Sequence, residues 1–473
     1  MNVRTRFAPS PTGYLHVGGI RTALFAHLVA KAAGGQFILR FEDTDKKREV
    51  AGSADHLIAS LKAIGIAYDE GPDIGGEYGP YVQSERLDTY KRWAQELIDA
   101  GRAYADPYTS AEVQAFREQA QATKQPFLYR NHRPEMPPVW DGTQPLRFKS
   151  EPKAYTWHDE VMGDISTGPE VVDDFILIKS DGYPTYNFAH IVDDAEMKIT
   201  HVIRGQEFIS SMPNYLNLYE ALGLKFPIFA HMPHIMNEQG NKKLGKRDGA
   251  KDVLDYIRNG YLPETVMSFI ATLGWNDGTT KEIFTYDELV STFSLDRVQR
   301  SGARFDEKRL IWMNGSFIRN LSLEDLYART KDFWPDSALT VDDDMRKKVL
   351  ALVQDRMKTL VDLPLLTSFF FVEPKINKTL ISGNKQLRNL SDDEIKHILT
   401  AVHQALSVTE WNPDAIQETL NNLLTRLDQK PAVLFGLIRI ATTWAPFSPQ
   451  LNDTLALLGK ERSLARIQTT INA

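Results

Sequence analysis

Residues 3–42, VRTRFAPSPTGYLHVGGIRTALFAHLVAKAAGGQFILRFE, contain two strand patterns separated by a helix pattern. Val3, Thr5 and Phe7 alternate with two arginines, which is typical of a strand. After a loop rich in proline and glycine, apolar residues recur at helical spacing until a glycine pair ends the pattern. The run QFILRF then predicts a second strand, so the segment indicates one strand–helix–strand unit.

The alternation of strands and helices continues beyond this segment. A second helix pattern contains Leu57, Leu61 and Ile64, and the order strand, helix, strand, helix predicts a parallel α/β sheet. Strand patterns return at FILIK, KITHVIRG and PIFAHMPHIM, after a region rich in proline, arginine and aromatic residues that we interpret as an insertion. From about Leu321 the pattern becomes mostly helical.

Length and composition limit the class of protein. A chain of 473 residues suggests two to four domains, and 42% hydrophobic with 25% charged residues is typical of a soluble globular protein. The absence of cysteine excludes disulfides and thiolate zinc sites. We expect a cytoplasmic location because neither a secretory leader nor a membrane-spanning run is evident. The net charge of −7 argues against indiscriminate coating of nucleic acid but permits a local basic face.

Three charged residues lie at the ends of predicted strands. Arg6 ends the first predicted strand, Glu42 ends the second, and Arg204 ends KITHVIR. Ligands of open α/β sheets bind at the carboxyl ends of the strands, so these side chains could meet around one ligand. Two arginines suit carboxylates and one carboxylate suits an ammonium group, which indicates an amino acid. For each residue alone, a solvated strand end is the simpler explanation.

Two further segments are candidates for phosphate binding. His16, Gly18 and Gly19 open the first helix, whose N-terminus favours an anion. NKKLGKRDGA, residues 241–250, places four cations in a loop between glycines. Neither segment matches a Walker A motif or a G-x-G-x-x-G fingerprint, and each alone could be an ordinary turn or a solvated loop.

Several quoted motifs occur in an order that resembles the glutamyl-tRNA synthetases, a bacterial-type branch of the class I aminoacyl-tRNA synthetases. HVGG is similar to the family's His-Ile-Gly-His signature and KLGKR to its Lys-Met-Ser-Lys-Ser signature. RFAPSPTGYLHVGG, FILRFEDTD, KSDGYPTYNFAHIVDD, THVIRGQE and WMNG match the branch at corresponding places. The resemblance extends from about residue 3 to 315 and continues more thinly into the helical part.

The resemblance implies an α/β fold with four parts. It places a Rossmann-type catalytic domain with a parallel sheet at residues 1–85 and 185–240, interrupted by an acceptor-stem-binding insertion at 86–184. A linker or stem-contact domain with the KLGKR loop would occupy 241–320. An all-helical anticodon-binding region, with one or two subdomains, would occupy 321–473.

The resemblance also implies an activity, the ATP-dependent ligation of L-glutamate to tRNA(Glu) through a glutamyl-adenylate, with Mg²⁺ on the ATP. The implied catalytic residues are His16, Lys243 and Lys246. The implied ATP-binding residues are His16, Gly18, Gly19, Lys243, Lys246 and Arg247. The implied glutamate-binding residues are Arg6, Ala8, Ser10, Glu42, Tyr186 and Arg204, and Arg356 is the anticodon candidate.

Within this scheme, Arg6 and Tyr186 would bind the side-chain carboxylate and Arg204 the α-carboxylate. Glu42 and Ser10 would bind the ammonium group. His190 lies in the same pocket segment and receives no role. The two histidines of HMPH lack an evident third metal ligand, so we interpret them as structural.

The sequence departs from the family pattern at two places. Gly245 stands where the second signature usually has serine, which removes a hydroxyl near the triphosphate. The cysteine-rich zinc knuckle that some members have in the insertion is impossible in a chain without cysteine, and we expect no zinc. We expect a monomer without membrane contact.

Other functions stay open at the level of sequence. A glutaminyl-tRNA synthetase, or a glutamyl enzyme that also charges tRNA(Gln), would share the catalytic design, although relatives of the former have β-barrels where this tail is helical. A small nucleotidyltransferase would not need the helical tail. A non-catalytic RNA-binding paralogue would not need His16, Lys243 and Lys246.

Overall fold

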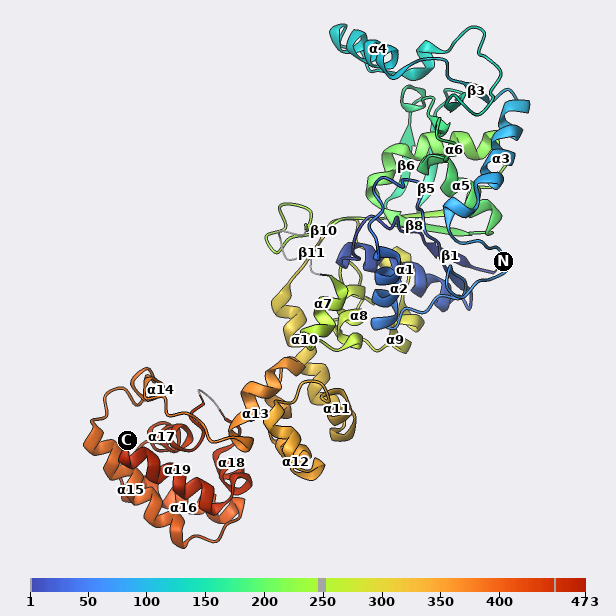
Figure 1. Ribbon diagram of the computed structural model, residues 1–473. Helices are drawn as coiled ribbons and strands as arrows, with labels where there is room; N and C mark the ends of the chain where they lie inside the picture. The colour runs from blue at the N-terminus through green and yellow to red at the C-terminus, as the bar shows by residue number, and fades with distance from the viewer. Residues whose placement is uncertain (1, 246–251, 446–447) are drawn as a thin grey trace. The chain divides into compact units, whose positions relative to one another are not determined.

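The computed structural model describes residues 2–245, 252–445 and 448–473 and divides the chain into two compact units. The first unit comprises Met1–Arg258 and Pro263–Glu307, and the second comprises Asn259–Leu262 and Lys308–Ala473. Figure 1 shows mixed helices and strands in the first unit and helices in the second. The four finer domain boundaries expected from the sequence stay a prediction.

The first unit contains a sheet whose inner strands are parallel. Strands β1 (Arg4–Phe7) and β2 (Gln36–Leu39) pair in parallel, as do β8 (His201–Gly205) and β9 (Ile228–Met232). The amide of Thr200 donates to the carbonyl of Arg4 across 2.9 Å and thereby joins β1 to the start of β8. The parallel α/β sheet expected from the sequence is therefore present.

Two more strands extend the sheet beyond β9. Strand β5 (Tyr155–Asp159) pairs in parallel with β9 at Asp159 and Phe229, and β6 (Gly163–Thr167) is antiparallel to β5. The sheet is thus mixed at this edge. These two strands lie within residues 86–184, the range expected for the insertion, although they hydrogen-bond to the main sheet.

The alternating pattern of β1 places its side chains against two helices. The Thr5 hydroxyl donates to the carbonyl of Ala26 in α1 (Val17–Ala32), whereas Arg6 pairs with Asp194 in α5 (Tyr186–Glu196). All four residues of β1 are buried because both faces of the strand are covered. Helix α1 ends before Gly34, whose φ of +61° is the left-handed conformation that glycine adopts readily.

The remaining elements of the first unit surround this sheet. A separate antiparallel sheet has the order β3–β4–β7, and α4 has no buried residue and extends from the unit in Figure 1. The helices are α2 (Ser53–Ala63), α3 (Leu87–Asp99), α4 (Ser110–Ala122), α6 (Met212–Ala221), α7 (Val253–Arg258), α8 (Pro263–Ala271) and α9 (Tyr286–Thr292). The short strands are β3 (Ala103–Ala105), β4 (Leu146–Phe148), β7 (Ile176–Ile178), β10 (Ile235–Met236) and β11 (Ala303–Arg304).

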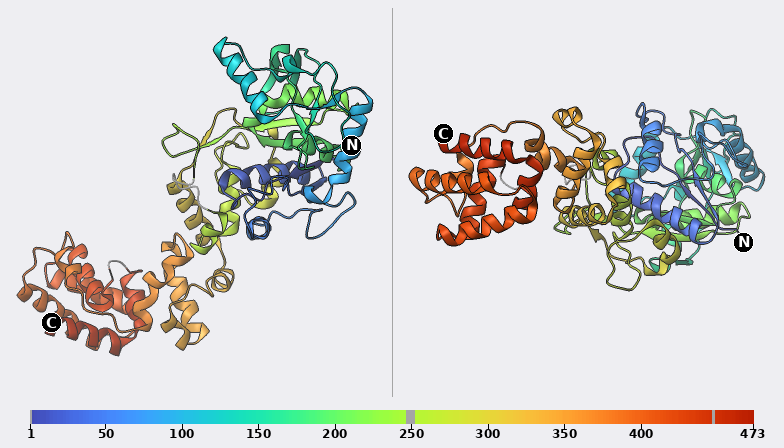
Figure 2. Two further views of the ribbon diagram at one scale, coloured as in Figure 1. Left: turned by 45° about the horizontal axis from the view of Figure 1, so that its top comes forward. Right: turned by 90° about the horizontal axis from the view of Figure 1, so that it is seen from below.

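The described residues of the second unit form helices and connecting loops without a strand, as Figure 2 shows for the orange and red segments. Helices α10 to α13 share one apolar core, and α15 to α19 share another. The helices are α10 (Glu307–Asn320), α11 (Leu323–Arg329), α12 (Asp343–Val353), α13 (Leu363–Phe371), α14 (Thr379–Ser382), α15 (Asp392–Val408), α16 (Pro413–Arg426), α17 (Pro431–Thr443), α18 (Leu451–Leu458) and α19 (Lys460–Asn472). The helical C-terminal region expected from the sequence is confirmed.

One buried amide joins three segments of the second unit. Asn314 in α10 is fully buried, and its Oδ1 accepts a hydrogen bond from the amide of Leu262 at 2.8 Å. Its Nδ2 donates to the carbonyl of Lys358 at 2.6 Å and to that of Gly260 at 3.5 Å. Asn314 therefore fixes the short excursion 259–262 within the helical unit.

Across the described residues, no helix has the length and apolar character needed to cross a membrane.

Candidate functional site

The loop FAPSPTG after β1 is held at two points by backbone acceptors. The carbonyl of Pro9 accepts from the amide of Glu42 at 3.0 Å, and the carbonyl of Pro11 accepts from the Ser53 hydroxyl at 2.7 Å. Ala8 is partly buried and Ser10 is exposed on this loop. The prolines supply no amide hydrogens, but their carbonyls connect the loop to the end of β2 and the start of α2.

His16 is the N-cap of α1. Its Nδ1 accepts a hydrogen bond from the amide of Gly18 at 3.2 Å, so the neutral ring has its hydrogen on Nε2. A Cβ atom on Gly18 would lie 3.3 Å from Cε1 of His16, which explains why glycine suits this position. The exposed His16 ring can therefore offer an Nε2–H donor beside a helix N-terminus.

Arg6 and Glu42 belong to one buried network of charges. Arg6 Nε lies 3.0 Å from Asp194 Oδ1, and Arg40 Nη1 lies 2.8 Å from the same oxygen. Arg40 Nη2 lies 2.9 Å from Glu42 Oε1. All four side chains are at most 4% exposed, which rules out the solvated strand end as the explanation for Arg6 and Glu42.

The two carboxylates of this network have opposite pKa shifts. Burial raises the pKa of Glu42 to about 7, although Arg40 and Arg6 act in the other direction. Burial would also raise the pKa of Asp194, but Arg6 and Arg40 outweigh it and lower the pKa to about 2. Asp194 is thus a permanent anion between two arginines, whereas Glu42 can change charge near neutral pH.

Arg204 lies at the end of β8 with all three of its guanidinium nitrogens in contact. Nε donates to His231 Nε2 at 3.1 Å, Nη1 lies 3.3 Å from His190 Nε2, and Nη2 lies 2.9 Å from Met212 Sδ. The guanidinium also lies 5.1 Å from the ring centre of Phe208 and 4.9 Å from that of Tyr215. Arg204 is only 5% exposed, so it too is a buried group.

Helix α5 presents three side chains at helical spacing toward these arginines. Tyr186 and His190 stack with ring centres 4.7 Å apart, and Asp194 pairs with Arg6 one turn further along. Burial and the charge of Arg204 lower the pKa of His190 to about 3, so its ring is neutral. Burial raises the pKa of the Tyr186 hydroxyl, which keeps that group a hydrogen-bond donor at neutral pH.

The first residue of the KLGKR segment pairs with strand β10. The backbone of Lys243 bridges to Met236, and Lys243 Nζ lies 3.8 Å from Glu207 Oε1. Asp252, the first described residue after 245, bridges to the His16 backbone, and its Oδ2 lies 2.6 Å from His56 Nε2. Lys246 and Arg247, which the sequence singled out, lie outside the described residues, whereas Gly245 lies within them.

Comparison with known proteins agrees with this arrangement. The family model for the catalytic domain of class I tRNA synthetases (E and Q) matches residues 2–312. The chain belongs to this family. A second model, of an anticodon binding domain, matches residues 325–471 of the synthetase.

The synthetase is similar along its whole length to proteins named glutamate–tRNA ligase. That of Clostridium botulinum (strain Hall) is 40% identical over 99% of this chain and 98% of its own length. That of Chloroflexus aurantiacus is 41% identical over 100% of this chain and 98% of its own. A crystal structure of a glutamate tRNA ligase from Elizabethkingia meningosepticum, in complex with its amino acid, is 33% identical with a TM-score of 0.91 and full coverage of both chains.

The second unit of the synthetase has an exposed aromatic side chain surrounded by cations. Trp312 in α10 is 49% exposed and lines a hollow of about 330 Å³ with Lys308, Arg319 and Lys358. An aromatic ring among cations is a common surface for stacking a nucleobase beside its phosphates. Arg356, the anticodon candidate, is exposed in the same unit.

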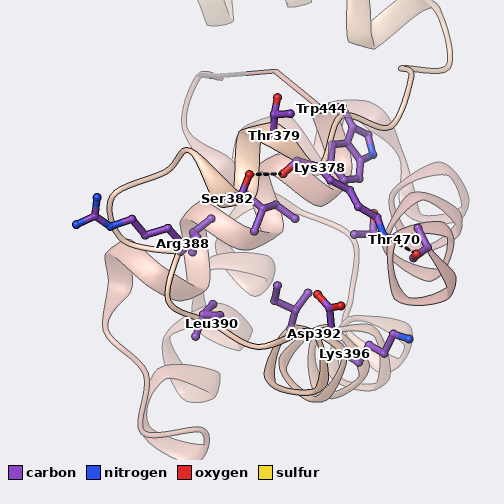
Figure 3. Close-up of a pocket in the computed structure, with 13 residues that line it drawn as sticks. Lys378, Thr379, Ser382, Arg388, Leu390, Asp392, Lys396, Trp444 and Thr470 are labelled. Atoms are coloured by element: carbon purple, nitrogen blue, oxygen red, sulfur yellow. Dashed lines mark hydrogen bonds between the residues drawn. The ribbon is translucent and has the colours of Figure 1, made fainter.

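Another cavity of about 330 Å³ lies among the C-terminal helices of the synthetase, between Trp444 and Asp392 (Figure 3). Lys378 donates to the backbone oxygen of Ala473 at 2.6 Å. Figure 3 shows Arg388 and Lys396 extending to opposite sides of the cavity. Its cations do not converge on one point, and we assign it no part in the chemistry.

Three residues of the synthetase pocket were not singled out for a role by the sequence. His190 and Asp194 share the α5 face of Tyr186, and their spacing of four residues could have revealed them. Arg40 lies two residues before Glu42, where nothing in the pattern distinguishes it from a surface arginine. Within residues 2–245, 252–445 and 448–473, no three His, Asp or Glu side chains are grouped as for a metal ion.

Proposed function

We propose that this chain ligates L-glutamate to tRNA(Glu) at the expense of ATP. One observation carries the proposal: three buried charged groups meet at one face of α5, where Arg6 pairs with Asp194, Glu42 joins it through Arg40, and Arg204 lies 3.3 Å from His190 Nε2. Two buried cations and one buried carboxylate complement an amino acid that has two carboxylates and one ammonium group. A neutral amino acid would bring no second carboxylate to accept from the donors of buried Arg6 that Asp194 does not engage.

Each glutamate group has a proposed partner in the pocket. Arg6 and Tyr186 bind the side-chain carboxylate, and Arg204 binds the α-carboxylate. Glu42 binds the ammonium group together with the loop residues Ser10 and Ala8. Asp194 supports this assignment, because it accepts from Nε and Nη2 of Arg6 at 3.0 and 3.2 Å and so holds the guanidinium in position.

In the first step, an oxygen of the glutamate α-carboxylate attacks the α-phosphorus of ATP. The new P–O bond forms as the bond to the bridging oxygen breaks, and pyrophosphate leaves with both electrons of that bond. His16 donates from Nε2 to a phosphate oxygen, and Lys243 and Lys246 neutralise the charge that develops. Gly18, Gly19 and Arg247 complete the ATP site, with Mg²⁺ bound to the phosphates.

In the second step, a terminal ribose hydroxyl of tRNA attacks the carbonyl carbon of the adenylate. The ester bond forms, the hydroxyl proton leaves to solvent or a phosphate oxygen, and AMP departs. The chain's own groups position the reactants and stabilise negative charge, so the reaction needs no covalent protein intermediate. The helical second unit, with Arg356 as a contact, recognises the anticodon of tRNA(Glu), and the protein works as a cytoplasmic monomer.

The test is aminoacylation with purified components. We expect esterification of tRNA(Glu) by glutamate, at least about a hundredfold faster in kcat/KM than any reaction with glutamine. Equal charging of tRNA(Gln) with glutamate would favour the enzyme that serves both tRNAs. Preference for free glutamine as the amino acid would overturn the proposal in favour of a glutaminyl enzyme.

A further inference from the structure

Asp159 and His231 form a fully buried pair behind the pocket. Asp159 ends β5 and His231 lies in β9, and both side chains are 0% exposed. His231 Nδ1 lies 2.6 Å from Asp159 Oδ2. The other oxygen, Oδ1, accepts from the amides of Val161, Met162 and His231 at 2.9–3.2 Å.

These contacts determine which nitrogen of His231 bears the hydrogen. The pKa of Asp159 is lowered, since its hydrogen bonds to His231 and to backbone amides outweigh its burial, and burial lowers the pKa of His231. An ionised carboxylate therefore faces a neutral ring, and Nδ1 must donate. This leaves the lone pair on Nε2, which accepts from Arg204 Nε at 3.1 Å.

His190 acts on the other side of the guanidinium in the same way. The carbonyl of Tyr186 lies 2.7 Å from His190 Nδ1, so that nitrogen donates and Nε2 can accept from Arg204 Nη1. With Met212 Sδ on Nη2, three of the five N–H groups of Arg204 have protein partners. One N–H remains on each terminal nitrogen, so both nitrogens keep a donor for a carboxylate.

We propose that Asp159 and His231 are positioning residues that aim the Arg204 guanidinium at a substrate carboxylate. The proposal rests on the proposed function, in which Arg204 binds glutamate. Asp159 sets the tautomer of His231, His231 holds Arg204 by its Nε, and the two free N–H groups then face the pocket. The three residues form one chain from β5 through β9 to β8, three neighbouring strands of the sheet.

Asp159→Asn tests the tautomer without changing the size of the side chain. Three backbone amides donate to Oδ1, so the amide oxygen will take that place and the NH₂ group will face His231. His231 must then accept at Nδ1 and bear its hydrogen on Nε2, where it meets the Arg204 Nε–H as a second donor. We expect the KM for glutamate to rise about tenfold to a hundredfold, with the KM for ATP within about twofold of wild type.

Two substitutions of His231 provide a matched pair. In His231→Gln the amide reaches the position of Nε2 and can still accept from Arg204, whereas in His231→Asn it reaches only the position of Nδ1. Both remove the same buried ring. We expect the glutamate KM of His231→Gln to stay within about threefold of wild type and that of His231→Asn to rise at least about tenfold.

The measurement is pyrophosphate exchange at saturating tRNA, with melting temperature and ATP affinity as checks of folding. If Asp159→Asn does not fold, the His231 pair decides alone. Unchanged glutamate KM in both Asp159→Asn and His231→Asn, with a raised KM in Arg204→Gln, would overturn the positioning role and leave the proposed function intact. An unchanged KM in Arg204→Gln would instead remove Arg204 from the glutamate site and overturn both assignments.

Discussion

Arg40 Nη2 and Glu42 Oε1 lie 2.9 Å apart in a site where Arg40 is 0% and Glu42 3% exposed. Arg40 also pairs with Asp194, and its Nε lies 3.7 Å from Asp193 Oδ2, so one guanidinium serves three carboxylates. Since Asp194 has Arg6 as a second partner and Glu42 does not, the anionic form of Glu42 is the less stabilised of the two. A substrate ammonium group would supply the missing positive charge.

The affinity for glutamate should therefore depend on pH. Below its pKa of about 7, Glu42 is protonated and cannot pair with an ammonium group. The glutamate KM should fall by up to about tenfold per unit as pH rises toward about 7, and level off by about pH 8. Pyrophosphate exchange at saturating ATP and tRNA measures this, and Glu42→Gln should have a higher KM that does not change over the same range. A sloping profile in Glu42→Gln would assign the titration to another group.

Gly18→Ala should impair the step that uses ATP. The added Cβ would lie 3.3 Å from the His16 ring and would displace Nδ1 from the Gly18 amide. We expect the rate of adenylate formation to fall by roughly 10- to 100-fold, less than the roughly 10²–10³-fold loss expected for His16→Ala. The control is Gly13→Ala in the loop before α1, where an added Cβ meets no atom within 4 Å. An equal loss of rate in Gly18→Ala and Gly13→Ala would contradict this explanation.

Arg6→Gln should weaken the choice between glutamate and glutamine. The two amino acids have nearly the same size, and glutamine would turn an amide donor toward the guanidinium. Wild type should prefer glutamate by roughly 10⁴, and the variant should lose most of this preference while its KM for ATP is unchanged. Arg4→Gln on the same strand is the control: Arg4 pairs with Glu70 at 2.9 Å, so its loss should lower the melting temperature and leave the preference intact.

Trp312→Ala should weaken the binding of tRNA without affecting the amino acid site. Loss of one stacking surface costs about 1–3 kcal/mol, so the Kd for tRNA should rise by roughly 5- to 150-fold. Filter binding of labelled tRNA measures the effect, and the glutamate KM at saturating tRNA should stay within about twofold. Val408→Ala, which truncates an 85% exposed side chain of the same unit, should leave the Kd unchanged.

Asn314→Leu should destabilise the helical unit. The substitution removes the partners of the Leu262 amide and the Lys358 carbonyl in a fully buried place. Each unpaired group costs about 1–3 kcal/mol, so a total of about 2–6 kcal/mol is expected, visible as a lower melting transition in calorimetry. Asn320→Ala at the exposed end of the same helix should change stability by less than about 0.5 kcal/mol.

Local patterns predicted the secondary structure well where one periodicity dominated. The alternation in β1 and the apolar spacing of α1 are visible in the sequence, and both elements occur as expected. The different partners of Arg4 and Arg6 are not visible there. They occupy equivalent alternate positions, and only the fold shows that Glu70 pairs with one and Asp194 with the other.

The same limit applies to the histidines of the pocket. His190 lies one helical turn from Tyr186, so its place could be inferred once α5 was recognised. His231 and Asp159 meet only because β5 and β9 pair in parallel at Asp159 and Phe229. The two residues are 72 positions apart in the chain, which is too far for a local sequence pattern to connect them. The sequence of neither strand shows which strand it will pair with.

The excursion at 259–262 has a consequence for building chimaeras between relatives. The backbone leaves the first unit after Arg258, returns at Pro263 and leaves again after Glu307, so the helical unit is assembled from two separate pieces. A transplant that begins at Lys308 would pair a donor's Asn314 with a recipient's Gly260 and Leu262. In a chimaera, residues 259–262 should be exchanged together with the C-terminal piece. A single junction at Lys308 would place residues of two different proteins in contact inside the helical unit.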